Sequence, residues 1–194
     1  MILEKIIDAL AVRVAQTGFV SKSGGLLREV WVAKPEGGSR KLPAAVVAGR
    51  NELSHFTPDD SETAMTWWEA SATRVSRQGA SAMHLENDLR FFAWLNTERL
   101  RPRDPLAAEL ALLKQVRDTV FDTEGSPVRR AIVQYLGDDA ADTGAFSTRF
   151  GFDEAEHQML LPPFKLVAMR FKVSYSVALG EDCDAPISVI SKTC

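Results

Sequence analysis

Residues 166–179 read LVAMRFKVSYSVAL, and this stretch decides the fold class. Apolar residues occupy every second position from Val167 to Leu179. A period of two sustained over so many residues is typical of a β-strand with one buried and one solvated face, and no helix has it. The polar positions between the apolar ones are Arg170, Lys172, Ser174 and Ser176.

Two other segments predict helices. Residues 2–16 place apolar side chains at helical spacing, and Gly18 follows where a helix can end in a left-handed cap. Asp104 suits the N-cap of a second helix and Pro105 suits its first position. The apolar stripe predicted for this second helix consists of Leu106, Leu110, Leu113, Val116 and Val120.

Further segments predict strands and loops. Gly24-Gly25 lies between two apolar runs and is interpreted as a turn that joins two strands. A short apolar run or a period of two predicts strands at 43–48, 63–76, 83–96 and 127–136, although a helix stays the rival interpretation of 63–76 and 83–96. Polar composition predicts loops at 51–60 and 137–151, and irregular structure at 150–164.

Segregated helices and strands predict an α+β fold, in which a mostly antiparallel, twisted sheet carries two main helices packed on it. A chain of 194 residues is expected to form a single domain, 1–194, with 180–194 as a C-terminal tail or edge strand. Cys183 and Cys194 both fall in that tail. Free thiols are the expectation for them, and a tail disulfide or a metal pair is the alternative.

The composition narrows the function classes. A formal net charge of −3 argues against nucleic-acid binding by the domain as a whole, although a local basic patch is compatible with it. The N-terminus is amphipathic and acidic, and lacks the basic lead and the apolar run of a signal peptide or a membrane span. The sequence therefore predicts a cytoplasmic protein with no membrane partner.

One candidate site lies on the predicted strand 83–96. His84, Glu86 and Asp88 share one face of that strand, where they could bind a cation, form part of an enzyme site, or simply be the solvated side of a sheet. The sequence contains no nucleophile elbow, phosphate-binding glycine loop or dinucleotide fingerprint. It therefore assigns no catalytic, cofactor-binding or metal-binding residue and no small-molecule substrate.

Aromatic residues suggest a candidate interface. Trp67 and Trp68 are adjacent in a predicted strand and point to opposite faces, so at least one of them needs cover beyond a single core. Helices on both faces would bury them; the alternative is contact between subunits, where aromatic residues concentrate. The candidate interface residues, including the charges of the last strand, are Trp67, Trp68, Phe92, Trp94, Arg170 and Lys172.

The element order, with the segments DLRFFAWLN at 88–96 and FKVSYSV at 171–177, resembles that of phage tail-terminator and neck (head–tail joining) proteins. The resemblance implies a structural protein of a phage or prophage that assembles into a ring, usually a hexamer, with other tail or neck proteins as partners. It implies a virion component with no cofactor and no catalytic residues. The segments 51–62 and 137–151 and the cysteine-containing tail lengthen the compact core of that family.

Two other functions compete with the structural one. The first is a small enzyme of unknown class with a site near His84, Glu86 and Asp88, which requires these groups to converge in a concave pocket. The second is a monomeric module that binds a protein by adding a strand to an exposed sheet edge.

Overall fold

The computed structural model describes residues 2–34, 37–50, 52–79, 81–117, 119–122 and 128–178. Its main element is a seven-stranded sheet, and the fold has the predicted α+β class. The strands of this sheet are β1 (Lys22–Leu26), β5 (Ala64–Ala70), β6 (Arg74–Gln78), β7 (Ala82–Asn96), β8 (Val120–Asp122), β9 (Val128–Asp139) and β10 (Phe164–Ala178). Their order is β1-β5-β7-β10-β9-β8, with β6 also paired to β7. β1 and β5 run parallel, and the other pairs are antiparallel.

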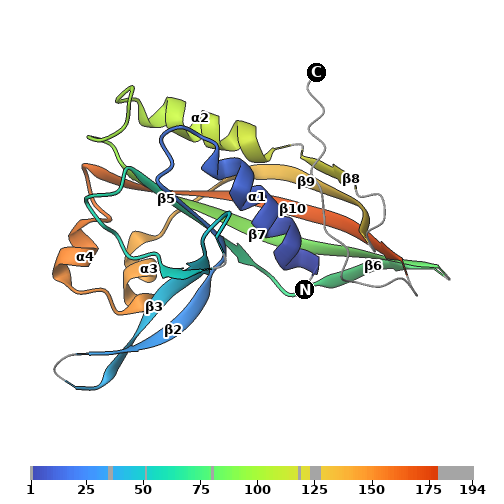
Figure 1. Cartoon of the computed structure of the whole chain (residues 1–194), viewed down its shortest axis with the longest axis horizontal. Helices are drawn as coiled ribbons and strands as arrows, with labels where there is room; N and C mark the ends of the chain where they lie inside the picture. The colour runs from blue at the N-terminus through green and yellow to red at the C-terminus, as the bar shows by residue number, and fades with distance from the viewer. Residues whose placement is uncertain are drawn as a thin grey trace.

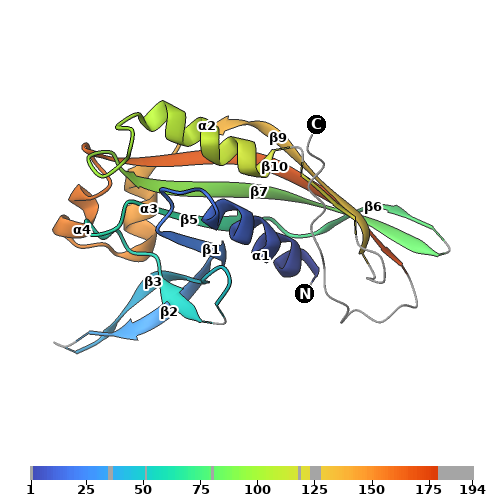
Figure 2. The ribbon, with the colours of Figure 1, turned by 45° about the horizontal axis from the view of Figure 1, so that its top comes forward.

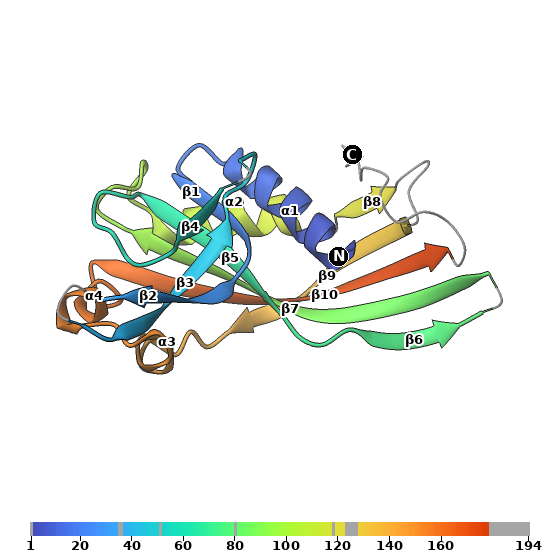
Figure 3. The same cartoon turned by 60° about the horizontal axis from the view of Figure 1, so that its bottom comes forward.

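The sheet is covered differently on its two faces. Two helices lie on one face, α1 (Ile2–Ala15) and α2 (Pro105–Val116) (Figures 1 and 2). The other face carries α3 (Thr143–Phe150) at one end of the sheet (Figure 3). Near that end lie a short helix α4 (Glu154–Gln158) and a small three-stranded sheet of β2 (Arg28–Ala33), β3 (Ser39–Val46) and β4 (Leu53–His55).

β7 and β10 form the centre of the sheet. Each is 15 residues long, and they pair without a break from Asn96 opposite Phe164 to Ala82 opposite Ala178. The alternation predicted for β10 is confirmed, because Phe171, Val173, Tyr175 and Val177 are all buried. The strand interpretation of 83–96 is confirmed as well, and so is a strand within 63–76.

Two hydrophobic cores lie on the two faces. Trp68 packs with Phe91 and Phe171 in the core beneath α1 and α2, with ring centroids 4.7 and 5.9 Å away. Trp67 belongs to the second core and stacks on Phe92 at 5.7 Å. The two adjacent tryptophans therefore do point to opposite faces, and the chain itself buries both of them.

The burial of the predicted interface aromatics corrects their interpretation. Trp67, Trp68, Phe92 and Trp94 are at most 5% exposed, so none of them presents a surface to a second subunit. The indole Nε1 of Trp94 also donates a hydrogen bond of 2.6 Å to the carbonyl oxygen of Met159. These aromatic residues hold the chain's own layers together.

The interpretation of Gly24-Gly25 as a turn is wrong. Both glycines lie inside β1, and neither has a positive φ. A Cβ atom on Gly24 would overlap the ring of Phe56 and come within 2.9 Å of the Cβ of Ala45, and one on Gly25 would overlap the carboxylate of Asp8. These glycines are needed for close packing, not for chain reversal.

The prediction for the second helix is right in its start and wrong in its buried side. The Asp104 side chain accepts a hydrogen bond from the backbone N–H of Ala107, as an N-cap does. The helix ends at Val116, however, and Val120 begins β8. Its buried residues are Ala108, Leu112 and Val116, whereas Leu106 and Leu110 are exposed, because the helix is rotated about its axis relative to the predicted stripe.

The predicted loop at 137–151 is also wrong. β9 continues to Asp139, and Asp142 caps α3 by accepting a hydrogen bond from the N–H of Ala145. Its buried Phe146 and Phe150 carry the cover of the second face. The segment 150–164, predicted to be irregular, contains α4, and 51–60 contains β4. The predictions for Cys183, Cys194 and the tail at 180–194 fall outside the described residues.

Candidate functional site

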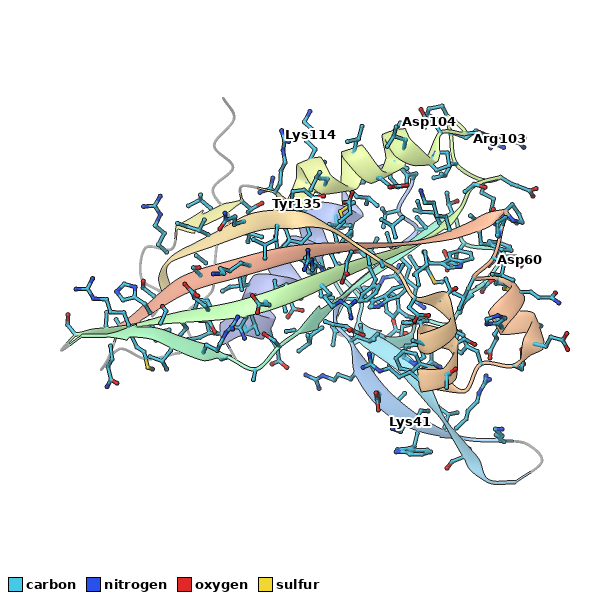
Figure 4. The ribbon with its side chains drawn as sticks, turned by 180° about the vertical axis from the view of Figure 1, so that it is seen from behind. Lys41, Asp60, Arg103, Asp104, Lys114 and Tyr135 are labelled. Atoms are coloured by element: carbon cyan, nitrogen blue, oxygen red, sulfur yellow. The ribbon has the colours of Figure 1, made fainter. Side chains whose placement is uncertain are left out.

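The face of the main sheet opposite α1 and α2 divides into two halves. In the covered half, Phe92, Trp94, Leu166 and Ala168 pack against α3 and its neighbours. In the open half none of the described helices lies over the sheet (Figure 4). The open half carries His84, Glu86, Asp88 and Arg90 on β7, Arg170, Lys172, Ser174 and Ser176 on β10, Arg130, Ile132 and Gln134 on β9, and Arg74 and Arg77 on β6.

The register of β7 and β10 brings two predicted groups together. His84 lies opposite Ser176, Glu86 opposite Ser174, and Asp88 opposite Lys172. The acidic candidate site and the basic face of the last strand are therefore one surface. The sequence alone could not show this, because it does not specify which strands are neighbours.

Ion pairs neutralise the two carboxylates of the predicted trio separately. The Nζ of Lys172 lies 3.4 Å from the Oε2 of Glu86, and Arg74 pairs with Asp88. Arg90, the next residue on this face of β7, pairs with Asp139 at 2.7 Å. Glu86 and Asp88 therefore point to different cations and do not converge with His84 on one point.

His84 has a different partner. Its Nδ1 lies 2.7 Å from the Oγ of Ser176. A histidine that activates a serine needs a third group to orient the imidazole and donors to stabilise an oxyanion. Within the described part of the chain, no side chain bonds the other ring nitrogen of His84, and no group of three or more potential ligands could hold a metal ion. This geometry does not favour the enzyme hypothesis.

On the opposite face, β7 and β10 carry buried polar side chains that bond to one another. Tyr175 donates a hydrogen bond of 3.2 Å to the Oδ1 of Asn87, and the Nδ2 of Asn87 donates to the carbonyl oxygen of Ser71 and to the hydroxyl of Thr73. Burial raises the pKa of the Tyr175 phenol. This polar network joins β7 to β10 beneath the open half.

Known proteins do not identify the chain: no protein-family model, curated protein or solved structure matches it. Among the described residues, no helix is long and apolar enough to cross a membrane. Function therefore has to be inferred from the chain's own residues.

The structure adds one exposed aromatic residue that the sequence interpretation did not select. Trp31, on β2, is 67% exposed, and the Nζ of Lys41 on β3 lies 5.5 Å from its ring centroid. The β2–β3 hairpin projects from the body of the molecule (Figures 1 and 2). Trp31 stands in the alternating run REVWVA, which predicts a strand but gives no indication of which face is covered.

Proposed function

We propose that the chain is a structural subunit of a phage or prophage tail or neck, and that it assembles with copies of itself into a ring. The observation that carries the assembly is a pair of exposed apolar surfaces that face different ways. One surface is Trp31 on the β2–β3 hairpin, and the other is Leu106 with Leu110 on α2. The element order of the chain supports the phage context.

The β2–β3 hairpin holds Trp31 in an exposed position. Two ion pairs fix the hairpin to the body. One joins Glu29, near its base, to Arg149 of α3 at 2.9 Å, and the other joins Arg40, opposite Val32 towards its tip, to Glu156 of α4 at 2.9 Å. Trp31 lies on β2 beyond Glu29, and no other ring packs on it among the described residues. A large aromatic side chain held out on a fixed arm is typical of an interface anchor.

The α2 surface is a short apolar stripe. Leu106 and Leu110 are 64% and 57% exposed and lie one helical turn apart. Single exposed leucines are common on soluble proteins, but adjacent ones that face outward from a helix form a continuous patch. The helix α2 that carries this patch lies on the opposite side of the body from the hairpin (Figures 1 and 2).

The placement of the two surfaces favours a ring over a two-fold dimer. A two-fold dimer uses the same patch on both subunits, whereas contact between two different patches repeats from one subunit to the next. Such a head-to-tail contact closes into a ring when the rotation between neighbours permits it. Insertion of Trp31 of one subunit beside Leu106 and Leu110 of the next would be a contact of this kind.

Light scattering coupled to size-exclusion chromatography tests the assembly. We expect the full chain to elute as a multiple of its 21.4 kDa mass at high concentration. Trp31→Ser and Leu110→Glu should each lower that mass without lowering the melting temperature, because both side chains are exposed. Val75→Ser is the matched control, since Val75 is exposed on β6 and away from both surfaces.

A strict monomer at every concentration and salt condition would contradict self-assembly and would favour a binding module that uses a sheet edge. The phage context has its own test in the gene neighbourhood. Flanking genes for capsid, portal or tail proteins would support it, and flanking genes for a metabolic pathway would contradict it.

A further inference from the structure

Four side chains form one row across the open half of the sheet. Arg77 of β6 lies opposite His84 of β7, His84 opposite Ser176 of β10, and Ser176 opposite Arg130 of β9. Neighbouring strands are about 4.8 Å apart, so the two arginines start about 14 Å from each other and both side chains are long enough to reach inward. The row therefore has a guanidinium at each end and a histidine and a serine between them.

These two arginines differ from most other charged residues of the open half. Arg74, Arg90 and Lys172 each have a carboxylate partner. Arg77 and Arg130, in contrast, form no ion pair with any side chain that the structure describes. The backbone of Asp122 lies opposite Arg130 in the β8–β9 register, and Glu86, which lines the same pocket, is paired with Lys172.

The row also lines a pocket. The pocket has a volume of 330 Å³ and lies where β7 begins and β10 ends. Its size is at the lower end of the range for small-molecule sites. Beside the row itself, its polar lining includes Ser76, Glu86 and Ser174.

We propose that this pocket binds the phosphate group of a small molecule, with Arg77 and Arg130 gripping it from opposite sides. Guanidinium groups suit phosphate because their planar donors can form two parallel hydrogen bonds to one oxyanion. The hydroxyl of Ser174 adds a donor from the lining of the pocket, and the hydrogen-bonded pair of His84 and Ser176 adds another. A tetrahedral anion has acceptor oxygens that point in several directions and can use donors from both ends of the row, whereas a planar carboxylate is best met from one side.

Isothermal titration and amide chemical-shift mapping of the full chain test this site, with inorganic phosphate and glycerol 3-phosphate as the two probes. Both should perturb the amides of 76–77, 84–86, 130–132 and 174–176. Arg77→Gln and Arg130→Gln should each weaken binding about tenfold, because each removes charge-assisted hydrogen bonds. Tighter binding of the ester would identify a phosphorylated metabolite as the ligand, and equal binding would identify free phosphate; both results support the site.

Arg170→Gln is the matched control. It removes the same charge from the same open half, but Arg170 is six positions from Ser176 along β10, about 20 Å away and beyond the screening length of about 8 Å at physiological salt. It should leave binding unchanged. The proposal is overturned if neither probe binds, if Arg170→Gln weakens binding as much as Arg77→Gln does, or if only a long polyanion such as single-stranded DNA binds. The site does not depend on ring assembly, so this test can fail while the light-scattering test succeeds.

Discussion

The covered and open halves of one sheet face are built from the same two strands and yet have opposite chemistry. On β7 the outward residues are His84, Glu86 and Asp88 in the open half, and Phe92 and Trp94 in the covered half. β10 changes in the same place, from Ser174 and Lys172 to Ala168 and Leu166. The backbone pairing is continuous across the change, so the hydrogen-bonded ladder alone does not determine what a strand's side chains must be.

What differs is the layer above the strands. Phe146 and Phe150 of α3 and Leu160 lie over the covered half and exclude water from it, so the strands need apolar residues there. Among the described residues no such layer lies over the open half, where Arg74 pairs with Asp88 and Lys172 with Glu86. Stability should therefore reside in the covered half, whereas substitutions in the open half should cost little stability.

Removing a large side chain from each half gives the largest expected contrast. Trp94→Ala should lower the free energy of unfolding by about 3–5 kcal/mol, because it leaves a cavity in the second core. It also leaves the carbonyl oxygen of Met159 without its indole donor. Glu86→Ala, eight residues earlier on the same side of β7, should change it by less than about 1 kcal/mol. Urea unfolding of both variants measures the difference, and equal losses would show that the two halves do not differ in this way.

Replacing one glycine in β1 and one after β6 by alanine should give a smaller difference in stability. Gly24→Ala should destabilise the fold by about 1–3 kcal/mol, because the new Cβ meets Phe56 and Ala45 in the second core. Gly79→Ala, beside the far end of β6, should stay within about 0.5 kcal/mol, since its Cβ comes only within 3.4 Å of the carbonyl oxygen of Ala82. Thermal unfolding followed by circular dichroism compares them. A tolerated Gly24→Ala would show that β1 can move away from Phe56 at little cost.

Ion pairs at the rim of each half give the smallest contrast. Arg149 bridges Glu29, at 2.9 Å, and Glu69, at 2.6 Å, so Arg149→Met should cost about 0.5–1 kcal/mol at pH 7. Lys172→Met, which breaks the single 3.4 Å contact with Glu86 in the open half, should cost less.

The effect of Arg149→Met should also depend on pH. Hydrogen bonds from Arg149 and then Lys41 hold the pKa of Glu29 below its ordinary value of 4.5. A carboxylate whose pKa is lower in the folded state stabilises the fold above its unfolded pKa, and this contribution disappears as the pH falls through the folded value. The difference between wild type and variant should thus be full at pH 7 and shrink below about pH 4.5. A difference that stays constant down to pH 3 would assign it to the packing of Arg149 on Phe150 instead.

The sequence was sufficient to predict features that depend only on the alternation of side chains along a single strand. The alternation from Val167 onward predicts β10. It was also sufficient to show that Trp67 and Trp68 need two layers of cover. These predictions use only the fact that neighbouring side chains of a strand point to opposite faces.

The sequence was insufficient where the answer depends on a partner segment. From the sequence alone Gly24 is interpreted as a turn residue, and only the structure shows that Phe56 packs against it. In the same way Leu106 is predicted to be buried, and only the structure shows that Ala108 is the buried residue instead. The row from Arg77 to Arg130 spans four strands, and the sequence does not specify which of these strands are neighbours. Trp31 and both arginines of the row were missed for this reason.

The unbroken pairing of β7 with β10 has a consequence for how the chain folds. β7 ends at Asn96 and β10 begins at Phe164, so the central ladder joins segments far apart in the sequence. The entropy lost in closing so long a loop opposes folding until the contacts of the ladder form, so we expect the sheet to fold slowly. On the ribosome β7 emerges before α3 and β10, so at that stage the edge that pairs with β10 is unpaired and α3 does not yet cover Phe92 and Trp94. Of all the described elements, β10 is synthesised last, and the sheet can close only when it arrives.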